Sequence, residues 1–347
     1  MRTKQKSVTI KDVAQRAGVA QSTVSLVINN KHTGERTKRK VLKAIRELDY
    51  HPTRLARGLA TQKTGNIGFI VSDTHFSRAE PFYTRVFLGT EFEARQYNYY
   101  VLLTTVEEEF DPQESIPRFL VEKNVDGVIL AGKVNDSLIF HIEKGDLPMV
   151  LIDYLPKNSK IASVLIDNVH GAYEAVCHLI ALGHKRIGFI GGSIDHPSIN
   201  DRLEGYKQAM KEFNLSINKK WIVKDEPYTS VDDGYRATKK LLKSTPLPTA
   251  IFATNDTMAI GVVKALKEAG FNVPKDISVI GFDDIEETPH TDPPLTTMRV
   301  FKEEMGILAV KKIMDMIDTG NTLKDKTLVP VELVIRSSCR QNKYATN

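Results

Sequence analysis

Apolar positions near the start of the chain recur at helical spacing in two short runs, which are Val13, Ala14 and Ala17 and then Val24, Val27 and Ile28. Thr9 is a candidate N-cap of the first run, because Asp12 lies three residues later and completes a capping box. Gly18 ends this run at a point where a positive φ costs little. The pattern predicts two helices joined by a tight turn over residues 9–29.

Small polar side chains lie between the apolar positions of the second run, at Gln21, Ser22, Thr23 and Ser25. Such groups suit contact with base edges and phosphates. The segment therefore predicts a helix-turn-helix whose second helix sits in a major groove of DNA. A third helix is predicted from about Glu35 to Leu48, with Val41, Leu42, Ile45 and Leu48 on its core side.

From Ile67 onward, short apolar runs alternate with helical patterns, which is typical of a parallel sheet flanked by helices. Three apolar runs of the first half return in the same order in the second half, namely 66–73 as 186–193, 126–132 as 249–256, and 148–153 as 278–284. The repetition predicts two similar lobes. The predicted fold class is a small all-α head and an α/β body of two doubly wound parallel-sheet lobes.

Polar residues follow several of the predicted strands and indicate where a ligand binds. Ligands of open α/β sheets bind beyond the carboxyl ends of the strands. Asp73, Gly132 and Asp153 end strands of the first lobe, and Ser193, Asn255 and Asp283 end strands of the second. Two lobes that face each other by these edges line one polar cleft, and lobe closure around a small ligand is the expected motion.

Composition narrows the protein class. No run of about 18 apolar residues occurs, so no membrane span is expected. The first seven residues have no hydrophobic region behind their basic side chains, so export is not expected either. Cys177 and Cys339 are the only cysteines, and they indicate reduced thiols in a cytoplasmic protein. No metal or other cofactor is expected.

Charge is divided unequally along the chain. Residues 1–64 carry fifteen Lys and Arg against four Asp and Glu, a net charge of +11, and the chain total of +5 leaves −6 for the rest. A basic head on a mildly acidic body indicates a head that binds phosphates, and a solvated basic helix face is the alternative.

The chain resembles the LacI/GalR family of bacterial transcription regulators over nearly its whole length. The motifs that carry the resemblance are Thr-Ile-Lys-Asp-Val-Ala at 9–14, Thr-Val-Ser at 23–25, Leu-Ala-Arg-Gly-Leu at 55–59, Ile-Asp-Asn at 166–168, His-Leu-Ile-Ala-Leu-Gly-His at 178–184, Asn-Asp at 255–256 and Gly-Phe-Asp-Asp at 281–284. The resemblance implies a homodimer on a palindromic double-stranded operator. It also implies a periplasmic-binding-protein-like domain whose small-molecule effector controls the affinity for DNA.

The resemblance also assigns DNA-contacting residues. Gln21, Ser22 and Leu26 occupy base-reading positions, and Thr23 and Ser25 resemble phosphate contacts. Leu26 cannot donate to guanine and suits a thymine methyl, although a surface leucine without a role is the alternative. Leu59 matches the hinge-helix leucine that is wedged into a minor-groove step. The further DNA-binding candidates are Thr9, Asn29, Arg54 and Arg57.

Effector-binding residues follow from the same resemblance. Those that match aromatic platforms are Phe82, Tyr83 and Tyr154, and those that match the polar contacts are Arg202, Asp283 and Asn255. Further pocket candidates are Asp73, His75 and Ser198. An aromatic platform beside Arg and Asp suits a sugar or a sugar derivative. His196 replaces an arginine of the purine-binding members, which argues against a purine. A core role for Phe82 and Tyr83, and a structural ion pair for Arg202 and Asp283, stay open.

The expected domains are a helix-turn-helix domain at 1–50, a hinge helix and linker at 51–64, an effector-binding and dimerisation domain at 65–340, and a tail at 341–347. Within the body, the first lobe takes about 65–163 and 294–324, and the second takes about 164–291 and 325–340.

The resulting hypothesis is a cytoplasmic DNA-binding regulator that acts as a repressor. An enzyme is not expected, since the chain has no phosphate loop and no Gly-x-Ser-x-Gly or His-Glu-x-x-His motif. A periplasmic-type sugar-binding protein without a regulatory role is the alternative. The effector, the operator sequence and the sign of control stay open.

Overall fold

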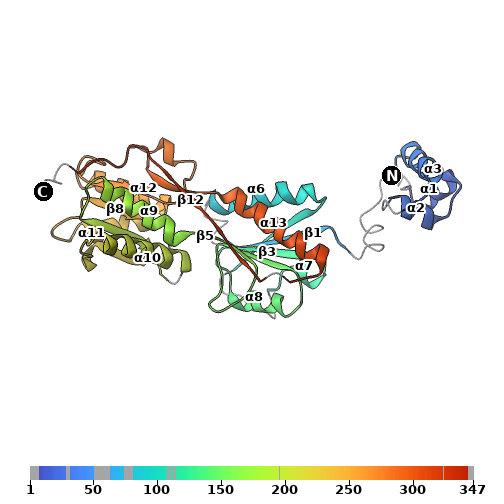
Figure 1. Ribbon diagram of the computed structural model, residues 1–347, viewed down its shortest axis with the longest axis horizontal. Coiled ribbons are helices and arrows are strands. Elements are labelled where there is room, and N and C mark those ends of the chain that lie inside the picture. Colours follow the sequence, from blue (N-terminus) through green and yellow to red (C-terminus); the bar gives the residue numbers. More distant parts are fainter. Residues whose placement is uncertain are drawn as a thin grey trace, which may run out of the picture. The chain divides into compact units, whose positions relative to one another are not determined.

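A computed structural model describes residues 8–28, 32–50, 63–73, 81–107, 111, 115–194, 196–322 and 324–342. The chain forms two compact units, one of Met1–Asn66 with Asn124–Asp126 and the other of Ile67–Lys123 with Gly127–Asn347. The first unit contains the helical head, and the second contains the α/β body (Figure 1). Among the described helices, none is both long enough and apolar enough to cross a membrane.

Three helices form the head, and they are α1 (Ile10–Ala17), α2 (Gln21–Ile28) and α3 (Glu35–Glu47). The Asp12 carboxylate accepts hydrogen bonds from the backbone amide of Thr9 at 2.8 Å and from its hydroxyl at 2.7 Å. Gly18 has a φ of 66°, and the Val19 amide donates to the Ala14 carbonyl at 3.1 Å. The predicted cap, turn and helices are confirmed.

The core of the head is formed by Val13, Ala14, Ala17, Val24, Val27, Val41, Ala44 and Tyr50. One part of the predicted core side of α3 is wrong, because Leu42 is 40% exposed and Ala44 is buried instead. Successive residues of a helix are about 100° apart. Leu42 therefore points away from the core once Val41 points into it.

Two sheets form the centres of the two lobes of the body, with strand orders β11-β5-β4-β3-β1-β2 in the first and β7-β6-β8-β9 in the second. The strands of the first sheet are β1 (Asn66–Ser72), β2 (Tyr100–Val106), β3 (Gly127–Ala131), β4 (Met149–Ile152), β5 (Ser163–Ile166) and β11 (Lys326–Val329). Those of the second are β6 (Ile187–Gly192), β7 (Ile222–Glu226), β8 (Ala250–Ala253) and β9 (Ser278–Ile280). In the first sheet the pairs β11-β5, β5-β4, β4-β3 and β3-β1 are parallel, and in the second the pairs β7-β6, β6-β8 and β8-β9 are parallel, as the sequence predicts.

The chain crosses between the lobes near β5 and β11, which pair with each other in the first sheet. The limits drawn from the sequence place residues 164–166 and 325–329 in the second lobe, whereas their pairing belongs to the first. β10 (Thr297–Val300) and β12 (Val331–Val334) form a separate antiparallel pair. Strand pairing joins residues that are distant in sequence, so apolar runs alone do not locate such a crossing.

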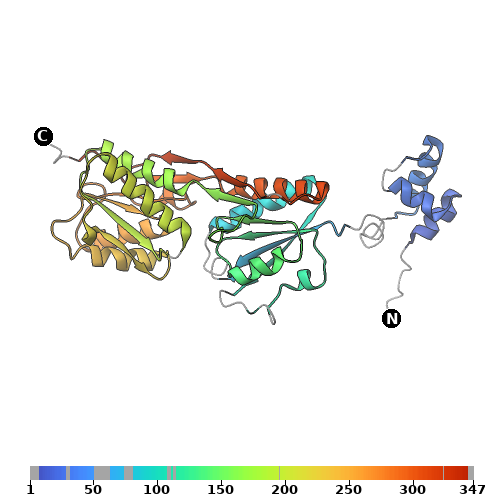
Figure 2. The same cartoon turned by 60° about the horizontal axis from the view of Figure 1, so that its bottom comes forward.

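Helices cover both sheets in closely packed pairs, α6 with α13, α9 with α10, and α11 with α12. In the first lobe, α6 and α13 lie on one face of the sheet and α8 lies on the other (Figure 2). The bounds are α6 (Pro81–Gln96), α7 (Arg118–Val121), α8 (Asp136–Glu143), α9 (Asn168–Ala181), α10 (Pro197–Glu212), α11 (Val231–Leu241), α12 (Asp256–Glu268) and α13 (Lys302–Thr319), with short 3₁₀ turns η1 (Lys219–Trp221) and η2 (Thr288–His290). Layers on both faces explain why the central strands, such as β3, β4 and β8, are continuous apolar runs.

Glycines lie where the paired helices touch. A Cβ added at Gly306 of α13 would overlap the Val86 carbonyl of α6, and one added at Gly89 of α6 would overlap the Glu303 carbonyl of α13. Gly205 has the same position between α10 and α9. Backbones that approach this closely leave no room for a methyl group, so each helix pair packs as a stiff layer.

We predict that Gly306→Ala lowers the stability of the body by about 1–3 kcal/mol, because α6 and α13 must separate to fit the new methyl. Gly145→Ala is the matched control, since its Cβ would lie 3.4 Å from the nearest atom. Urea unfolding followed by circular dichroism measures both variants. Equal unfolding midpoints for the two variants would contradict the tight helix contact.

Candidate functional site

The outward side of α2 is polar and uncharged. The residues expected to contact DNA from this helix are Gln21, Ser22, Thr23, Ser25 and Leu26, and all are exposed or half-buried. Leu26 is 40% exposed although it is large and apolar. The exposed Thr9 caps the neighbouring helix α1 through Asp12. Apart from this cap, the side chains named here have no part in the core of the head.

Five of the expected site residues lie outside the described residues, namely Asn29, Arg54, Arg57, Leu59 and His75. Of the expected hinge and linker at 51–64, the structure describes only Lys63 and Thr64. The roles assigned to these residues stay predictions.

Arg202 of α10 donates hydrogen bonds from all three nitrogens of its guanidinium group. Its Nε donates to the Asn168 side chain at 2.8 Å, one Nη donates to the Thr254 carbonyl, and the other donates to Asp283 Oδ1 at 3.3 Å. The guanidinium also lies 3.8 Å from the centre of the Phe282 ring. Arg202 is 4% exposed. All three of its nitrogens therefore donate within the protein, and the residue fixes the position of Asp283.

Asp283 lies in a tight turn beyond β9, where it and Asp284 both have positive φ values of 111° and 53°. Such backbone conformations are strained for residues other than glycine and need support from their surroundings. The Lys302 ammonium provides it by donating to the carbonyls of Asp283 and of Asp284, the latter at 3.2 Å. Burial lowers the pKa of Lys302, while the nearby Asp283 carboxylate opposes this shift.

Asp256, the first residue of α12, also supports this turn. Its carboxyl group is completely buried, and it accepts hydrogen bonds from the Thr297 hydroxyl at 2.5 Å and the Ile285 amide at 3.0 Å. Burial, together with the neighbouring Asp283 carboxylate, raises the pKa of Asp256 well above its ordinary value. The turn that carries Asp283 is therefore held by Arg202, Lys302 and Asp256.

Two other expected ligand residues of the second lobe also have structural partners. The Asn255 side chain caps α12 by accepting from the Met258 amide at 2.9 Å, and its Nδ2 donates to the Thr229 carbonyl at 3.2 Å. The Ser198 hydroxyl lies 2.6 Å from Nδ1 of His196. Both residues follow strands β8 and β6 at the carboxyl edge of the second sheet, where the sequence places a ligand.

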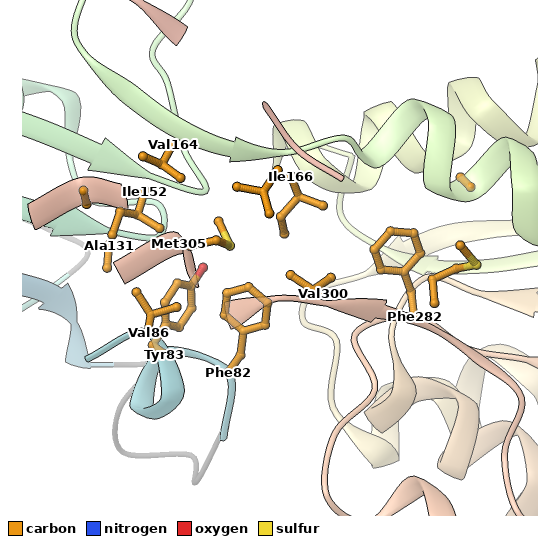
Figure 3. Close-up of a cluster of buried hydrophobic side chains, with 14 of the residues drawn as sticks. Phe82, Tyr83, Val86, Ala131, Ile152, Val164, Ile166, Phe282, Val300 and Met305 are labelled. Carbon is orange, nitrogen blue, oxygen red and sulfur yellow. The ribbon is translucent and has the colours of Figure 1, made fainter. Parts of the chain in front are cut away.

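The expected aromatic residues of the first lobe are buried. Phe82 and Tyr83 are 9% and 4% exposed, and Figure 3 shows both among the side chains around Met305 and Val300. The Tyr83 hydroxyl donates to Asp153 Oδ2 at 2.9 Å. Both side chains are therefore packed in the core, which the sequence left open as an alternative to ligand binding.

Tyr154 and Asp73 end strands of the same lobe. Tyr154 is buried, and its hydroxyl donates to Asp136 Oδ1 at 2.6 Å. The pKa of Tyr154 is raised, mainly by burial and secondly by this hydrogen bond. Asp73 follows β1 and is half-buried.

A charged joint connects the two lobes. Arg85 of α6 pairs with Glu286 of the second lobe and, at 3.0 Å, with Glu303 of α13. Lys302, the first residue of α13, lies 5.9 Å from the centre of the Phe82 ring. A cavity of about 600 Å³ opens at this joint, and its lining includes none of the expected ligand residues.

Arg202 belongs to the expected ligand set, but Asp256 and Lys302, which also hold the turn, and Asn168, which accepts from Arg202, do not. Asp256 and Asn168 belong to motifs that indicate the family, but their partners lie far away in the sequence. Lys302 follows Phe301 in an ordinary helix start, so no local signal marks it. Among the described residues, no group of three or more His, Cys, Asp or Glu side chains is placed to hold a metal ion.

Comparison with known families agrees with both units. The model of "Bacterial regulatory proteins, lacI family" matches residues 9–53, and that of "Periplasmic binding protein-like domain" matches residues 176–339. The HTH-type transcriptional repressor PurR of Pasteurella multocida (strain Pm70) is 35% identical over 335 residues, which cover 96% of this chain and 98% of that protein. PurR of Photobacterium profundum is 35% identical over 336 residues, with 96% and 98% covered.

Solved structures give the same result. A lac repressor dimer bound to operator and the anti-inducer ONPF has a TM-score of 0.81 and is 29% identical to this chain. The match covers 96% of this chain and 100% of that one. A complex of the transcriptional regulator CelR with cellobiose has a TM-score of 0.74 and 28% identity, with 95% and 99% covered. A binding protein without a regulatory role is not favoured, because these relatives include the head. The chain belongs to the lacI family of bacterial regulatory proteins and is a DNA-binding transcription regulator.

Proposed function

We propose that this protein is a cytoplasmic homodimeric repressor that binds a palindromic operator and is switched by a neutral, sugar-like effector between its lobes. The observation that carries the proposal is the Asp283 turn at the carboxyl edge of the second sheet, fixed by Arg202 and Lys302. Strained, heavily supported backbone in such a place is typical of a binding site. The lac repressor and CelR structures, with their named ligands, support an effector of this kind.

Charge around the turn supports a neutral effector. Arg202 donates from all three nitrogens to protein acceptors, and the Lys302 ammonium donates to backbone carbonyls. Neither cation needs an anionic ligand to balance it, because Asp283 lies beside both of them and Asp284 lies near Lys302. An effector that donates hydroxyl hydrogens to carboxylate and amide oxygens suits this arrangement better than a phosphate or carboxylate.

The contacts of the charged joint connect the Asp283 turn, where the effector would bind, with the first lobe, which continues toward the head. Lys302 connects the Asp283 turn of the second lobe to α13, and Arg85 connects Glu286 of the same lobe to α6. A ligand that moves the turn therefore moves the two helices that cover the first sheet. The first lobe continues into the predicted hinge at 51–64, so its movement changes the geometry of the DNA-binding heads.

We predict that the full-length chain selects a palindromic site from random duplex DNA and that Leu26 contacts a thymine methyl within it. Replacing that thymine by deoxyuridine removes only the methyl group, worth about 0.8 kcal/mol or about fourfold in affinity. Leu26→Ala should bind the thymine and deoxyuridine sites equally. Failure to select any site would contradict operator binding, and an undiminished methyl effect in the variant would contradict the role of Leu26.

We predict that a neutral sugar stabilises the protein against heat. Cellobiose, ribose, glucose 6-phosphate and hypoxanthine form the test panel for thermal shift, and a ligand at 100 times its Kd adds about 2.7 kcal/mol. Asp283→Asn should abolish the shift, whereas Asp315→Asn on the exposed side of α13 should retain it. A shift produced by the phosphate or the purine base alone would contradict the neutral-sugar proposal.

We predict that Lys302→Met weakens the response of operator affinity to a ligand more than it weakens ligand binding. The variant keeps the carboxylate of Asp283 but loses the link between the turn and α13, so a bound ligand changes operator affinity at least tenfold less than in the wild type. Lys311→Met, an exposed position on the same helix, is the control. An unchanged ratio of operator affinities with and without ligand in Lys302→Met shows that the response does not pass through this ammonium.

A further inference from the structure

The chain reaches the first sheet through a set of hydrogen bonds between residues 64–66 and residues 124–126. One oxygen of the Asp126 carboxylate accepts from the backbone amide of Thr64 at 2.7 Å. The other oxygen accepts from the backbone amide of Gly65 at 2.8 Å. These two segments are called the Asp126 clamp. Charged acceptors form stronger hydrogen bonds than neutral ones, so this carboxylate holds two consecutive amides firmly.

Further hydrogen bonds hold the same two segments together. The Asp126 amide donates to the Asn66 carbonyl at 2.9 Å. Nδ2 of Asn66 donates to the backbone carbonyl of Asn124 at 2.9 Å and to its side-chain oxygen at 3.2 Å. The Asn66 amide donates to the Thr64 hydroxyl at 3.2 Å. Three consecutive residues of the chain are therefore fixed against one short segment.

The residue types in the clamp suit this arrangement. Gly65 has a φ of 70°, a conformation that costs glycine little and strains other residues. An aspartate at 126 offers an acceptor oxygen to each amide, whereas an asparagine has one acceptor oxygen and a donor group. The clamp therefore depends on the carboxylate of Asp126 and on the backbone freedom of Gly65.

The clamp lies at the starts of two neighbouring strands. Asn66 is the first residue of β1, and Asp126 immediately precedes β3. The residues that follow them, Ile67 and Gly127, are register partners in the parallel pair of β1 and β3. The clamp therefore fixes the conformation in which the chain enters the sheet of the first lobe.

The clamp also lies at the end of the predicted hinge and linker at 51–64. The compact unit that contains the head includes residues 124–126 together with residues 1–66. Residues 124–126 are distant from the head in sequence, so their inclusion comes from contacts such as those of the clamp. The position at which the linker ends is therefore set by hydrogen bonds and not by chain connectivity alone.

A fixed linker end matters for a dimer that binds two half-sites. The two halves of a palindrome lie at a set separation and rotation, and both heads must match them at once. Ordering the backbone of one additional residue on binding lowers the affinity by about tenfold. Duplex DNA without a palindrome imposes no such spacing, so its binding does not require a fixed linker end.

We propose that the Asp126 clamp determines which spacing of half-sites the protein accepts on DNA. The inference rests on the proposed function, since it assumes a homodimer on a palindromic operator. Asp126 is a positioning residue, because it acts on DNA through Thr64, Gly65 and the linker and does not itself contact the operator.

The test compares the full-length wild type with Asp126→Ala on the palindromic site that the wild type selects from random duplex DNA. The site is used with its selected spacing, with one base pair added between the half-sites, and with one removed. Each change moves the half-sites by about 3.4 Å and about 35°. Fluorescence anisotropy at one fixed salt concentration measures the affinities, and a duplex without the palindrome measures non-specific binding.

The wild type should lose about tenfold or more in affinity when the spacing changes, and Asp126→Ala should lose about threefold or less. Asp126→Ala should bind the site of selected spacing about tenfold more weakly than the wild type, because its linker end is ordered only on binding. Both proteins should bind the non-specific duplex with affinities within about twofold of each other, since that binding requires no set spacing.

Two further variants separate the clamp from general effects. Asp146→Ala removes a carboxylate from an exposed turn that precedes β4, and it should keep the spacing dependence of the wild type. Gly65→Ala keeps Asp126 but disfavours the positive φ, so it should relax the spacing dependence in the same way as Asp126→Ala. This variant keeps the inference testable if Asp126→Ala does not fold.

Equal spacing penalties in the wild type and in the clamp variants overturn the inference, and so does a wild type that accepts all three spacings equally. An equal loss of operator and non-specific affinity in Asp126→Ala also overturns it, because positioning affects only the palindrome. A wild type that selects no palindromic site would instead refute the proposed function, so the two failures are distinguishable.

Discussion

The ammonium of Lys302, held against the carbonyls of Asp283 and Asp284, is the interaction on which the body depends. It stabilises two consecutive residues with positive φ, and it joins the first residue of α13 in one lobe to the strand-end turn of the other. Placing a charge in a buried position is costly unless the charge is hydrogen-bonded and balanced. Three backbone carbonyls and the nearby carboxylates meet that condition here.

The rest of the body consists of closely packed layers on either side of this joint. Glycines at the helix crossings, such as Gly89 and Gly306, allow backbone contact and stiff layers on the sheets. The lobes are joined by chain crossings near β5 and β11 and by exposed ion pairs such as Arg85 with Glu286. Exposed ion pairs are weak, typically about 0–1 kcal/mol. Stiff lobes that meet at such a joint are suited to a population shift driven by a small ligand.

Much of this architecture follows from the sequence. The capping box of Thr9 and Asp12, the left-handed Gly18 and the repeated apolar runs predict the head and the two parallel sheets. These features are local, and local patterns determine helices and buried strands. The exposure of Leu42 and the pairing of β5 with β11 were not predicted, because both depend on neighbours that are distant in sequence.

The candidate site likewise has one part that the sequence predicts and another that it does not. Asp283 and Arg202 were expected together, and the structure brings them to 3.3 Å. The full engagement of Arg202 with Asn168 and Thr254, and the contact of Lys302 with the turn, required the three-dimensional arrangement.

The central claim is that effector binding and operator binding are coupled through this joint. The most direct test measures the affinity of the stabilising sugar in the absence and presence of saturating operator. Coupling free energies are reciprocal, so the sugar affinity must change by the same factor as the operator affinity changes with sugar, typically about 5–150-fold. Equal sugar affinity with and without operator would contradict the account.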